Sequence, residues 1–341
     1  RHLNLGEDVV QTKEIYKVQD LPVGEAKAAL ISKPLPWLHR ASTEEFRDLY
    51  LALRDNARPS PAYLTLMVLS TLLATIGLFA NSAPVIIGAM ILAPLMAPII
   101  SLAMAVVRQD GVLLAGSLKT LGLGILLALG FAAMMTWVIP LRSVTDEIAA
   151  RLSPTLLDLG VAIVSGVAGA YAHAREEVAR SLAGVAIAVA LVPPLAVSGI
   201  GLGWGEWTLF QGSFLLFLTN LFGIVLAGNL TFLLLGFGPF SLARRGLLAS
   251  LVLVAVVSAP LGAGFARMVE EKAVIQALEG WETEGVVLRE TVVQPGNPLY
   301  LSVRLLSSST LDGAAVERVK RAIETRLDRP VTLEATVAIK R

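Results

Sequence analysis

Long apolar stretches, separated by short polar ones, fill the middle of the chain between Ala62 and Ala266. A helix that crosses the roughly 30 Å of bilayer hydrocarbon needs about 20 apolar residues. Seven stretches meet or approach this length, and we predict that each is a membrane-spanning helix. They cover about Ala62–Ala80, Ala83–Val107, Leu113–Ile139, Leu159–Ala174, Leu182–Gly203, Leu209–Gly236 and Leu247–Ala266.

The residues before the first span, 1–61, are predicted to form a soluble segment. Thr43–Arg54 is expected to be an amphipathic helix within it, and Ser42 with Glu45 fits a capping box at its start. The apolar residues of this helix recur at helical spacing: Phe46, Leu49, Tyr50 and Leu53. The pattern is typical of a helix that lies near the membrane surface, and a partner-binding helix is the alternative.

The residues after the last span, 267–341, return to mixed polarity and predict a small α+β domain. The pattern indicates a helix, two strands, a second helix and a third strand, and we expect half of a ferredoxin-like sandwich. The five segments are Met268–Leu278, Val286–Val293, Leu299–Leu305, Ala315–Leu327 and Val331–Ile339. About 75 residues make a marginal core alone, so we expect this domain to pack against a second copy or against the N-terminal segment. The predicted fold class is an all-α polytopic membrane bundle plus this domain.

The distribution of charge agrees with a membrane protein and excludes several other classes. Only 15 Asp, Glu, Lys and Arg residues lie between Ala62 and Ala266, and the formal net charge is +1. The chain therefore has no basic footprint for nucleic acid. It has no cysteine, which excludes disulfides, thiolate metal sites and thiol catalysis. Phosphate-loop, zinc-hydrolase and nucleophile-elbow motifs are absent too, so we expect neither an enzyme nor a cofactor.

Arginines near the predicted spans indicate an orientation. With seven spans, most flanking arginines fall on one side, which the positive-inside rule makes cytoplasmic. They are Arg40, Arg47, Arg54, Arg58, Arg108, Arg175, Arg180, Arg244 and Arg245. We therefore expect a multi-pass protein of the cell inner membrane, with a cytoplasmic N-terminus and the C-terminal domain on the outer side. One miscounted span would reverse the side of that domain.

An internal repeat appears when the sequence is shifted by 100 residues. Ser82–Leu102 and Leu182–Leu202 then match at seven of 21 positions, and Pro94 falls on Pro194. The two predicted halves are residues 62–140 and 159–236, with 247–266 as an extra span. Because each half has three spans, consecutive halves would insert in opposite directions, as in many transporters.

Prolines interrupt both matching spans: Pro94 and Pro98 in the second, and Pro193 and Pro194 in the fifth. Proline lacks an N–H and clashes with the carbonyl four residues earlier, so it frees carbonyl groups that need other partners in hydrocarbon. Ala93 and its neighbours could present such carbonyls to an ion or polar solute. Kinks that only shape helix packing are the alternative.

Two long motifs at these prolines resemble the DUF389 family of prokaryotic membrane proteins. They are Asn81–Ile99 (NSAPVIIGAMILAPLMAPI) and Gly184–Ala196 (GVAIAVALVPPLA), and the stretch from Leu218 to Asn229 fits the family pattern as well. The resemblance covers about Thr65–Asn229. It implies a membrane architecture and a prokaryotic origin, and it implies no substrate.

Polar residues inside the spans are candidate contacts for a solute, because such groups are costly in lipid. Asn220 and Asn229, with Thr219, lie in the sixth span, where helix–helix bonding is the alternative. Asn81 and Ser82 end the first span and could instead form a turn. Lys119 in the third span is a possible pore or interface charge, and it could instead extend to the membrane surface.

The sequence therefore supports two functions. The first is a transporter or channel for an unidentified small solute or ion, with a midplane site at the broken second and fifth spans. The second is a membrane-anchored oligomeric sensory or scaffold protein that acts through its C-terminal domain. The expected partners are the lipid bilayer, further copies of the chain and, for the first function, the solute.

Overall fold

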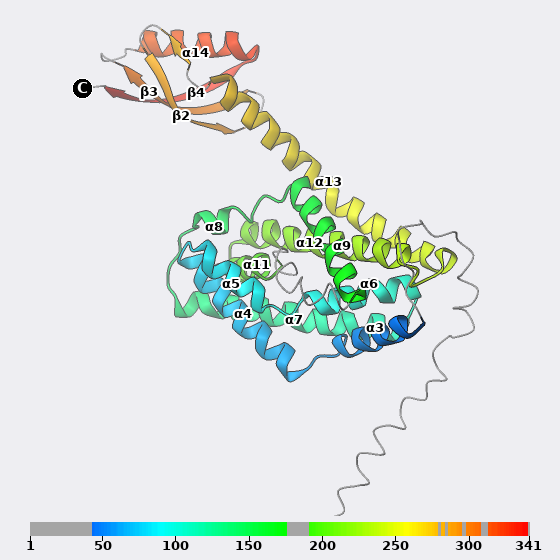
Figure 1. Cartoon of the computed structure of the whole chain (residues 1–341). Helices are drawn as coiled ribbons and strands as arrows, with labels where there is room; N and C mark the ends of the chain where they lie inside the picture. The colour runs from blue at the N-terminus through cyan, green and yellow to red at the C-terminus, as the bar shows by residue number, and fades with distance from the viewer. Residues whose placement is uncertain are drawn as a thin grey trace, which may run out of the picture. The chain divides into compact units, whose positions relative to one another are not determined.

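The computed structural model describes residues 43–175, 191–278, 281–283, 286–294, 298–307 and 313–339. These residues divide into two compact units. One comprises residues 43–153 and 158–257, and the other comprises 154–157 and the described residues from 258 onward. The first unit is all helical, and the second holds a small sheet (Figure 1).

The first unit follows the predicted spans closely. Its long helices are α4 (Pro61–Phe79), α7 (Gly111–Val138), α9 (Leu156–Ala174), α12 (Trp207–Leu234) and the first part of α13 (Phe240–Leu278). The second predicted span is a pair, α5 (Ala83–Leu92) and α6 (Met96–Arg108), bent by 53°. Within the described residues there are five candidate spans, or six if the bent pair is one span, rather than the seven expected.

The predicted fifth span is only partly visible. Its second half is α11 (Val192–Trp204), a helix of 13 residues. The first half, from Leu182 to Ala190, lies outside the described residues, and so does the first part of the second DUF389-like motif. At about 1.5 Å per residue, α11 is about 20 Å long, which is too short to cross a bilayer alone.

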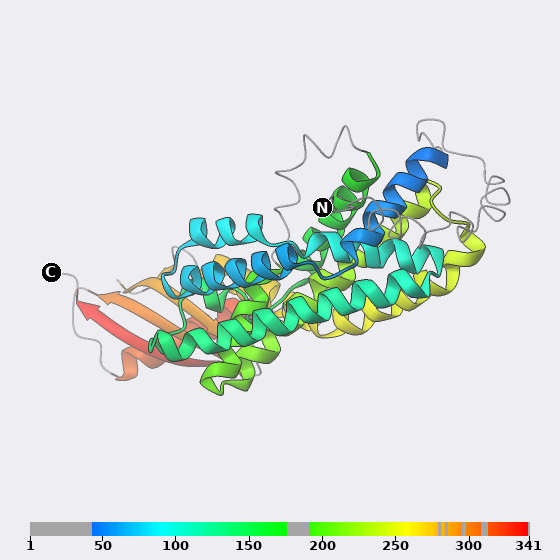
Figure 2. The same ribbon diagram turned by 90° about the horizontal axis from the view of Figure 1, so that it is seen from below.

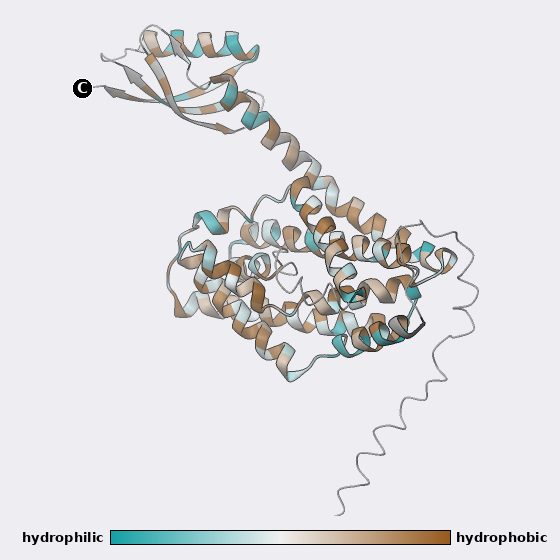
Figure 3. Cartoon of the chain, in the orientation of Figure 1, coloured by the Kyte–Doolittle hydropathy of each residue, from teal (hydrophilic) through white to brown (hydrophobic). Residues whose placement is uncertain are grey.

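The outward faces of this unit are strongly apolar, as Figure 3 shows for the helices around α4, α7 and α9. Trp137 is 82% exposed and Val164 is 70% exposed. A soluble monomer rarely exposes a continuous apolar surface of this kind. Together with the hydropathy of the helices, this exposure identifies a multi-pass membrane protein.

Small residues allow the helices to approach closely. A Cβ on Gly166 of α9 would lie 2.7 Å from Ile224 Cα, and one on Gly199 of α11 would lie 2.7 Å from Leu129 O. Gly77 of α4 likewise faces Ile86 of α5, in a hairpin that Figures 1 and 2 both show side by side. Close packing through small residues is the usual way in which helices associate in lipid.

The predicted amphipathic helix is α3 (Thr43–Asn56). Leu49 and Leu53 are buried in the core of the first unit, and the carbonyl of Leu53 accepts a hydrogen bond from Ser101 Oγ of α6 at 2.8 Å. The apolar face of α3 therefore packs on its own chain. The expected capping box cannot be assessed, because Ser42 lies outside the described residues.

The ends of the helices fall on two opposite faces of the first unit. On one face, Arg108 donates to Phe237 O at 3.4 Å, and Gly246 packs on Val106 and Gln109. This is the arginine-rich face, which carries Arg108, Arg244 and Arg245, with Arg175 at the end of α9. On the other face, Thr145 Oγ1 donates to Leu78 O at 2.8 Å. That face also carries the short helix α8 (Asp146–Ala149) and the loops at either end of it.

Two runs of elements in this unit have matching lengths. Helices α4 and α9 both have 19 residues, α6 and α11 both have 13, and α7 and α12 both have 28. Each element of the second run begins 95 or 96 residues after its counterpart. The caps agree as well, since α6 and α11 both begin after a leucine and end at a residue with positive φ.

The offset of these helix starts differs from the shift at which the two sequences match. The shift of 100 residues pairs Pro94 with Pro194, whereas the helix starts pair Pro98 with Pro194. In the same way, the helix starts place Asn220 opposite Gly124 rather than opposite Thr120.

The second unit contains a four-stranded sheet in the order β1 (Glu282–Thr283), β2 (Val286–Gln294), β3 (Leu299–Ser307) and β4 (Val331–Ile339). Strands β2 and β3 are antiparallel, whereas β3 and β4 are parallel and joined through α14 (Gly313–Leu327). A single core joins one face of the sheet to Val319 and Ile323 of α14 and to Leu278 of α13.

One expectation for this region is wrong. A ferredoxin-like sandwich contains split βαβ units, whereas β3 and β4 here pair directly along nine residues. The helix expected over Met268–Leu278 is confirmed as the last part of α13, which runs without interruption from Phe240 to Leu278. The residues after Ala266 are good helix formers, so the change in polarity there does not end the helix.

Candidate functional site

The break between α5 and α6 is centred on Ala93, Pro94 and Leu95. Ala93 has extended backbone angles (φ −70°, ψ 122°), and its N–H bonds only to Met90 O, at 3.3 Å. Pro94 explains the break, because it lacks an N–H and disfavours helical geometry in the residue before it. Pro98 lies in the first turn of α6, where a missing N–H costs no helical bond.

A serine on the neighbouring helix compensates for this break. In a continuous helix, Ala89 O would accept from the N–H of residue 93, which here bonds to Met90 instead. Ser70 Oγ of α4 donates to Ala89 O at 2.7 Å. The freed carbonyl therefore has a partner, as a hydrocarbon environment requires.

The second proline pair lies in the first turn of a described helix. Pro193 and Pro194 occupy the first turn of α11, after Leu191, and residues 191–200 are all buried. The Pro194 carbonyl accepts two hydroxyl groups, Ser198 Oγ at 2.8 Å and Ser213 Oγ of α12 at 2.7 Å. The sequence placed these prolines in mid-span, and in the described residues α11 begins at them.

Contacts along α7 place the starts of α6 and α11 at one level. Leu95, just before α6, lies against Gly124, which is at the middle of α7. Gly199 of α11 packs on Leu129, and Gly203 packs on Ala133, so the two helices are parallel. Both helices rise by the same distance per residue, and α11 begins seven residues before Gly199. Seven residues before Leu129, α7 is in the turn that contains Gly124, so α11 begins beside that turn.

Contacts along α12 place Asn220 at this level too. Gly228 of α12 packs on Ala103 of α6, and Gly238 beyond α12 packs on Val107, so α6 and α12 also run in parallel. Helix α6 begins seven residues before Ala103. The same number of residues before Gly228 leads to residues 220 and 221 of α12, which therefore lie beside the start of α6. Asn220, at the middle of α12, is 5% exposed. The candidate site is therefore the level shared by the starts of α6 and α11, Gly124 and Asn220.

Asn229, which we predicted to contact a solute, binds helices together. Its amide nitrogen faces Ala103 O at 2.8 Å and Val225 O at 3.1 Å, and its oxygen accepts from Ser250 Oγ of α13 at 2.9 Å. These bonds join α12 to α6 and α13. Thr219 is also buried, and its hydroxyl donates to Leu215 O within α12 at 2.8 Å.

Asn81 and Ser82 do not lie at the break. They form the turn between α4 and α5, where Asn81 has a φ of 50°. Its side chain accepts from the N–H of Glu147 at 3.0 Å and donates to Asp146 at 3.2 Å. The ten residues of α5 separate this turn from Ala93 by about 15 Å. The turn interpretation of Asn81 therefore fits its geometry, and its contacts tie α8 to the end of α4.

Lys119 is exposed on α7, five residues before Gly124. It lies on the outer surface of the unit and not with the residues of the candidate site. In the part of the chain that the structure describes, no group of three His, Cys, Asp or Glu side chains could hold a metal ion.

Several residues of this level were missed by the sequence analysis. Ser70, Ser198 and Ser213 satisfy the carbonyls near the two helix starts, and Gly124 makes room for Leu95. Serines four residues after a proline, such as Ser198, were a usable signal, because a hydroxyl often bonds to the carbonyl one turn earlier.

Comparison with known proteins supports the resemblance found in the sequence. The family model of the domain of unknown function DUF389 matches residues 90–226. An uncharacterized protein of Methanocaldococcus jannaschii is 28% identical over 193 residues, which are 57% of this chain and 60% of that protein. The chain thus spans less than two thirds of the length of this relative. The matched residues include the α5–α6 break and α11, and residues 90–226 are a DUF389 domain.

Proposed function

We propose that this chain is a membrane transporter or channel for a small solute or ion, with its site where α6 and α11 begin. The observation that carries the proposal is the pair of 13-residue helices that start at one level, beside the middle of α7. Helices that start inside a membrane are tolerated where their ends are buried in protein or line a water-filled cavity. Transporters often build their sites from such discontinuous helices.

The helix ends at this level offer both kinds of backbone group. In the first turns, Met96 and Ala97 of α6 and Val192 of α11 have N–H groups, whereas Pro98, Pro193 and Pro194 have none. The N-terminal ends of both helices carry partial positive charge, and α5 ends at this level with carbonyl groups. Asn220 adds an amide that can both donate and accept. Such a set can replace part of the hydration shell of a polar or charged solute. It contains no carboxylate, so the proposal does not involve a proton-carrying acid, an enzymatic step or a cofactor.

The matching runs support an inverted repeat, which we include in the proposal. Helix α4 ends at the face that carries α8, where Thr145 contacts Leu78, whereas α9 begins at that face, beyond Leu152, which packs on Gly212. The two runs, with equal lengths and caps, therefore cross in opposite directions. Inverted repeats of this kind allow a site to open alternately to the two sides.

The arginine-rich face defines the proposed orientation. The positive-inside rule places it in the cytoplasm of the cell, with α3 and the N-terminal segment, and the protein in the inner membrane. The first part of α13 starts from this face, since Gly246 packs on Val106 and Gln109 at the end of α6. After one crossing, the C-terminal unit would then lie on the outer side.

Self-association is the last part of this proposal. Strand β4 is the last strand in the order of the sheet, and it has nine residues without proline or lysine. Exposed strands of this length usually carry such protective residues or pair with another strand. Antiparallel pairing of β4 with the β4 of a second copy would cover this edge.

A second candidate function is a membrane-anchored sensory or scaffold protein. The observation that favours it is the continuity of α13, which contributes to a candidate span and also to the core of the C-terminal unit through Val274 and Leu278. Deletion of residues 268–341 separates the two functions. Flux that survives the deletion supports transport, and loss of assembly in a protein that never carries flux supports the alternative.

The decisive test of transport uses the absence of cysteine in the chain. We expect Asn220→Cys in proteoliposomes to react with a small charged thiosulfonate reagent, because water reaches the site. The matched control is Leu230→Cys on the exposed face of α12, which should not react because lipid surrounds it. If both are inert, or if wild-type liposomes carry no flux for any ion or small metabolite in a panel, the proposal is wrong.

A further inference from the structure

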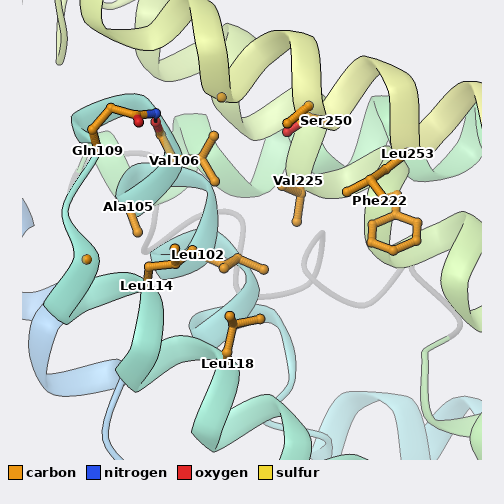
Figure 4. Close-up of a pocket in the computed structure, with 13 residues that line it drawn as sticks. Leu102, Ala105, Val106, Gln109, Leu114, Leu118, Phe222, Val225, Ser250 and Leu253 are labelled. Carbon is orange, nitrogen blue, oxygen red and sulfur yellow. Dashed lines mark hydrogen bonds between the residues drawn. The ribbon is translucent and has the colours of Figure 1, made fainter.

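A cavity lies in the first unit, toward the arginine-rich face and away from the helix starts. Its volume is about 370 Å³, and helices α6, α7, α12 and α13 line it (Figure 4). Among the side chains that line it, only those of Gln109 and Ser250 are polar, and Ser250 bonds to Asn229. The rest of the lining is aliphatic or aromatic, apart from two glycines.

The cavity extends along the helix axes. On α6 its lining runs from Gln109 to Leu102, on α7 from Gly111 to Leu118, and on α13 from Gly246 to Leu253. Each of these stretches spans seven residue steps, or about 10 Å. The cavity is therefore elongated and starts at the level where the helices meet the arginine-rich face.

The inner end of the cavity borders a surface that faces lipid. Leu118 is 53% exposed and Leu253 is 45% exposed, although both line the cavity. Figure 4 shows Leu118, Leu253 and Phe222 around the same space. An apolar volume beside exposed apolar side chains suits a hydrocarbon chain far better than water or a polar solute, since water needs polar partners.

The outer end of the cavity is bordered by cations. Arg244 and Arg245, directly before Gly246, are exposed. The nearest carboxylate along the chain is Asp110, between the lining residues Gln109 and Gly111. It accepts hydrogen bonds from Tyr50 and from the N–H groups of Val112 and Leu113. The charge at this end therefore favours a negative group at the membrane surface, where each such cation contributes about 1 kcal/mol.

We propose that this cavity binds an anionic phospholipid, with one acyl chain between α7 and α13 and its phosphate near Arg244 and Arg245. The site requires only that the chain lies in a membrane and does not depend on transport. The lipid would fill the space between α13 and the repeat helices, and so hold α13 against α6 and α12. Asn229 and Ser250 stabilise the same contact from the inner side.

The experiment is native mass spectrometry of the full chain, released from mixed vesicles of phosphatidylglycerol and phosphatidylcholine. We expect one phosphatidylglycerol to remain bound per chain, at least tenfold more often than phosphatidylcholine. Ala249→Trp, which fills the cavity, should reduce this retention at least fivefold. Val252→Trp is the matched control, because Val252 is exposed on the same helix but does not line the cavity.

A separate variant tests the charge. Arg244→Gln with Arg245→Gln should abolish the preference for phosphatidylglycerol while an acyl chain can still enter. The double variant leaves the helix contacts intact, so it remains informative if Ala249→Trp does not fold.

Equal retention of both lipids by the wild type overturns the proposal, and so does retention that Ala249→Trp leaves unchanged. Disulfide-linked dimers of Ala249→Cys would overturn it as well, by assigning the cavity to a second copy. Flux measured on the same variants tests the transport proposal independently.

Discussion

The two short helices of the first unit, α6 and α11, are equal in length and caps but differ in their surroundings. The first ten residues from Leu191 are all buried, whereas Met96 and Ala97 at the start of α6 are partly exposed. The Pro194 carbonyl accepts hydrogen bonds from two hydroxyl groups, whereas the Ala89 carbonyl, before α6, accepts one from a hydroxyl group. Among the described residues, the start of α11 is therefore more completely enclosed than the start of α6.

The largest effect expected from this comparison is on stability. Gly199→Leu in α11 should destabilise the protein by about 3 kcal/mol or more, because the new side chain would overpack the contact with Leu129 and Ala132. Gly88→Leu in α5 is the matched control, since a Cβ there meets only Leu73 at 3.9 Å. Thermal unfolding in detergent measures both. Equal losses would mean that α11 is no more tightly packed than α5.

A second difference concerns the role of each proline. Pro94→Ala restores an N–H and allows α5 and α6 to join, so the 53° bend should decrease and flux should fall at least tenfold. Pro194→Ala, in a first helical turn, should change flux less than twofold. Spin-label distances between α5 and α6 report the bend directly. A bend that persists in Pro94→Ala would show that tertiary packing, not proline, creates it.

A smaller effect is expected from the hydroxyl groups. Ser213→Ala removes one of two donors to the Pro194 carbonyl and should cost about 0.6 kcal/mol, the average for such bonds in membranes. Ser70→Ala removes the hydroxyl donor to Ala89 O and should cost more, about 1 kcal/mol. Urea or detergent unfolding of the two variants tests the order. The reverse order would contradict the view that the first break has less support.

The smallest effect concerns the attachment of α3 at the arginine-rich face. Burial opposes the charged form of Asp110, but the hydrogen bonds from Tyr50, Leu113 and Val112, with Arg54 nearby, lower its pKa below the usual value. Because the folded state binds the proton less tightly, this pair stabilises the protein above pH 4 and loses its effect as the pH falls further. Hydrogen exchange of α3 should therefore accelerate in acid, and Asp110→Asn should remove that pH dependence.

The phenol of the same pair gives a spectroscopic control. Burial, the hydrogen bond to Asp110 and its charge raise the pKa of Tyr50 to about 12. The phenolate signal of Tyr50, obtained as the difference from Tyr50→Phe, should therefore appear only above pH 11. A normal titration near pH 10 would mean that α3 is not held against Asp110 in solution.

Much of the architecture could be predicted from the sequence. The apolar lengths located the spans, and alternation of apolar residues located β2, β3 and β4 within two residues of their observed ends. These features are dictated by burial of apolar surface, which leaves a periodic record in the chain.

The candidate site was predicted less well, because the effect of a residue depends on its place in a helix. Pro94 breaks a helix, whereas Pro98 and Pro194 begin one, and the residue type alone does not distinguish these roles. Asn81 and Asn229 were expected to contact solute, yet their side chains bond to protein groups. Only Asn220 lies at the level of the helix starts. Its position follows from the register between α6 and α12, which no local pattern reveals.

The proposed inverted repeat also bears on how a repeated segment would acquire a direction. The last residue of α6 is Arg108, and the last residue of α11 is Trp204, so matching ends of these two helices carry a cation and an indole. Under this proposal the helical framework of each half would serve either direction of insertion, and the direction would depend on a few flanking side chains.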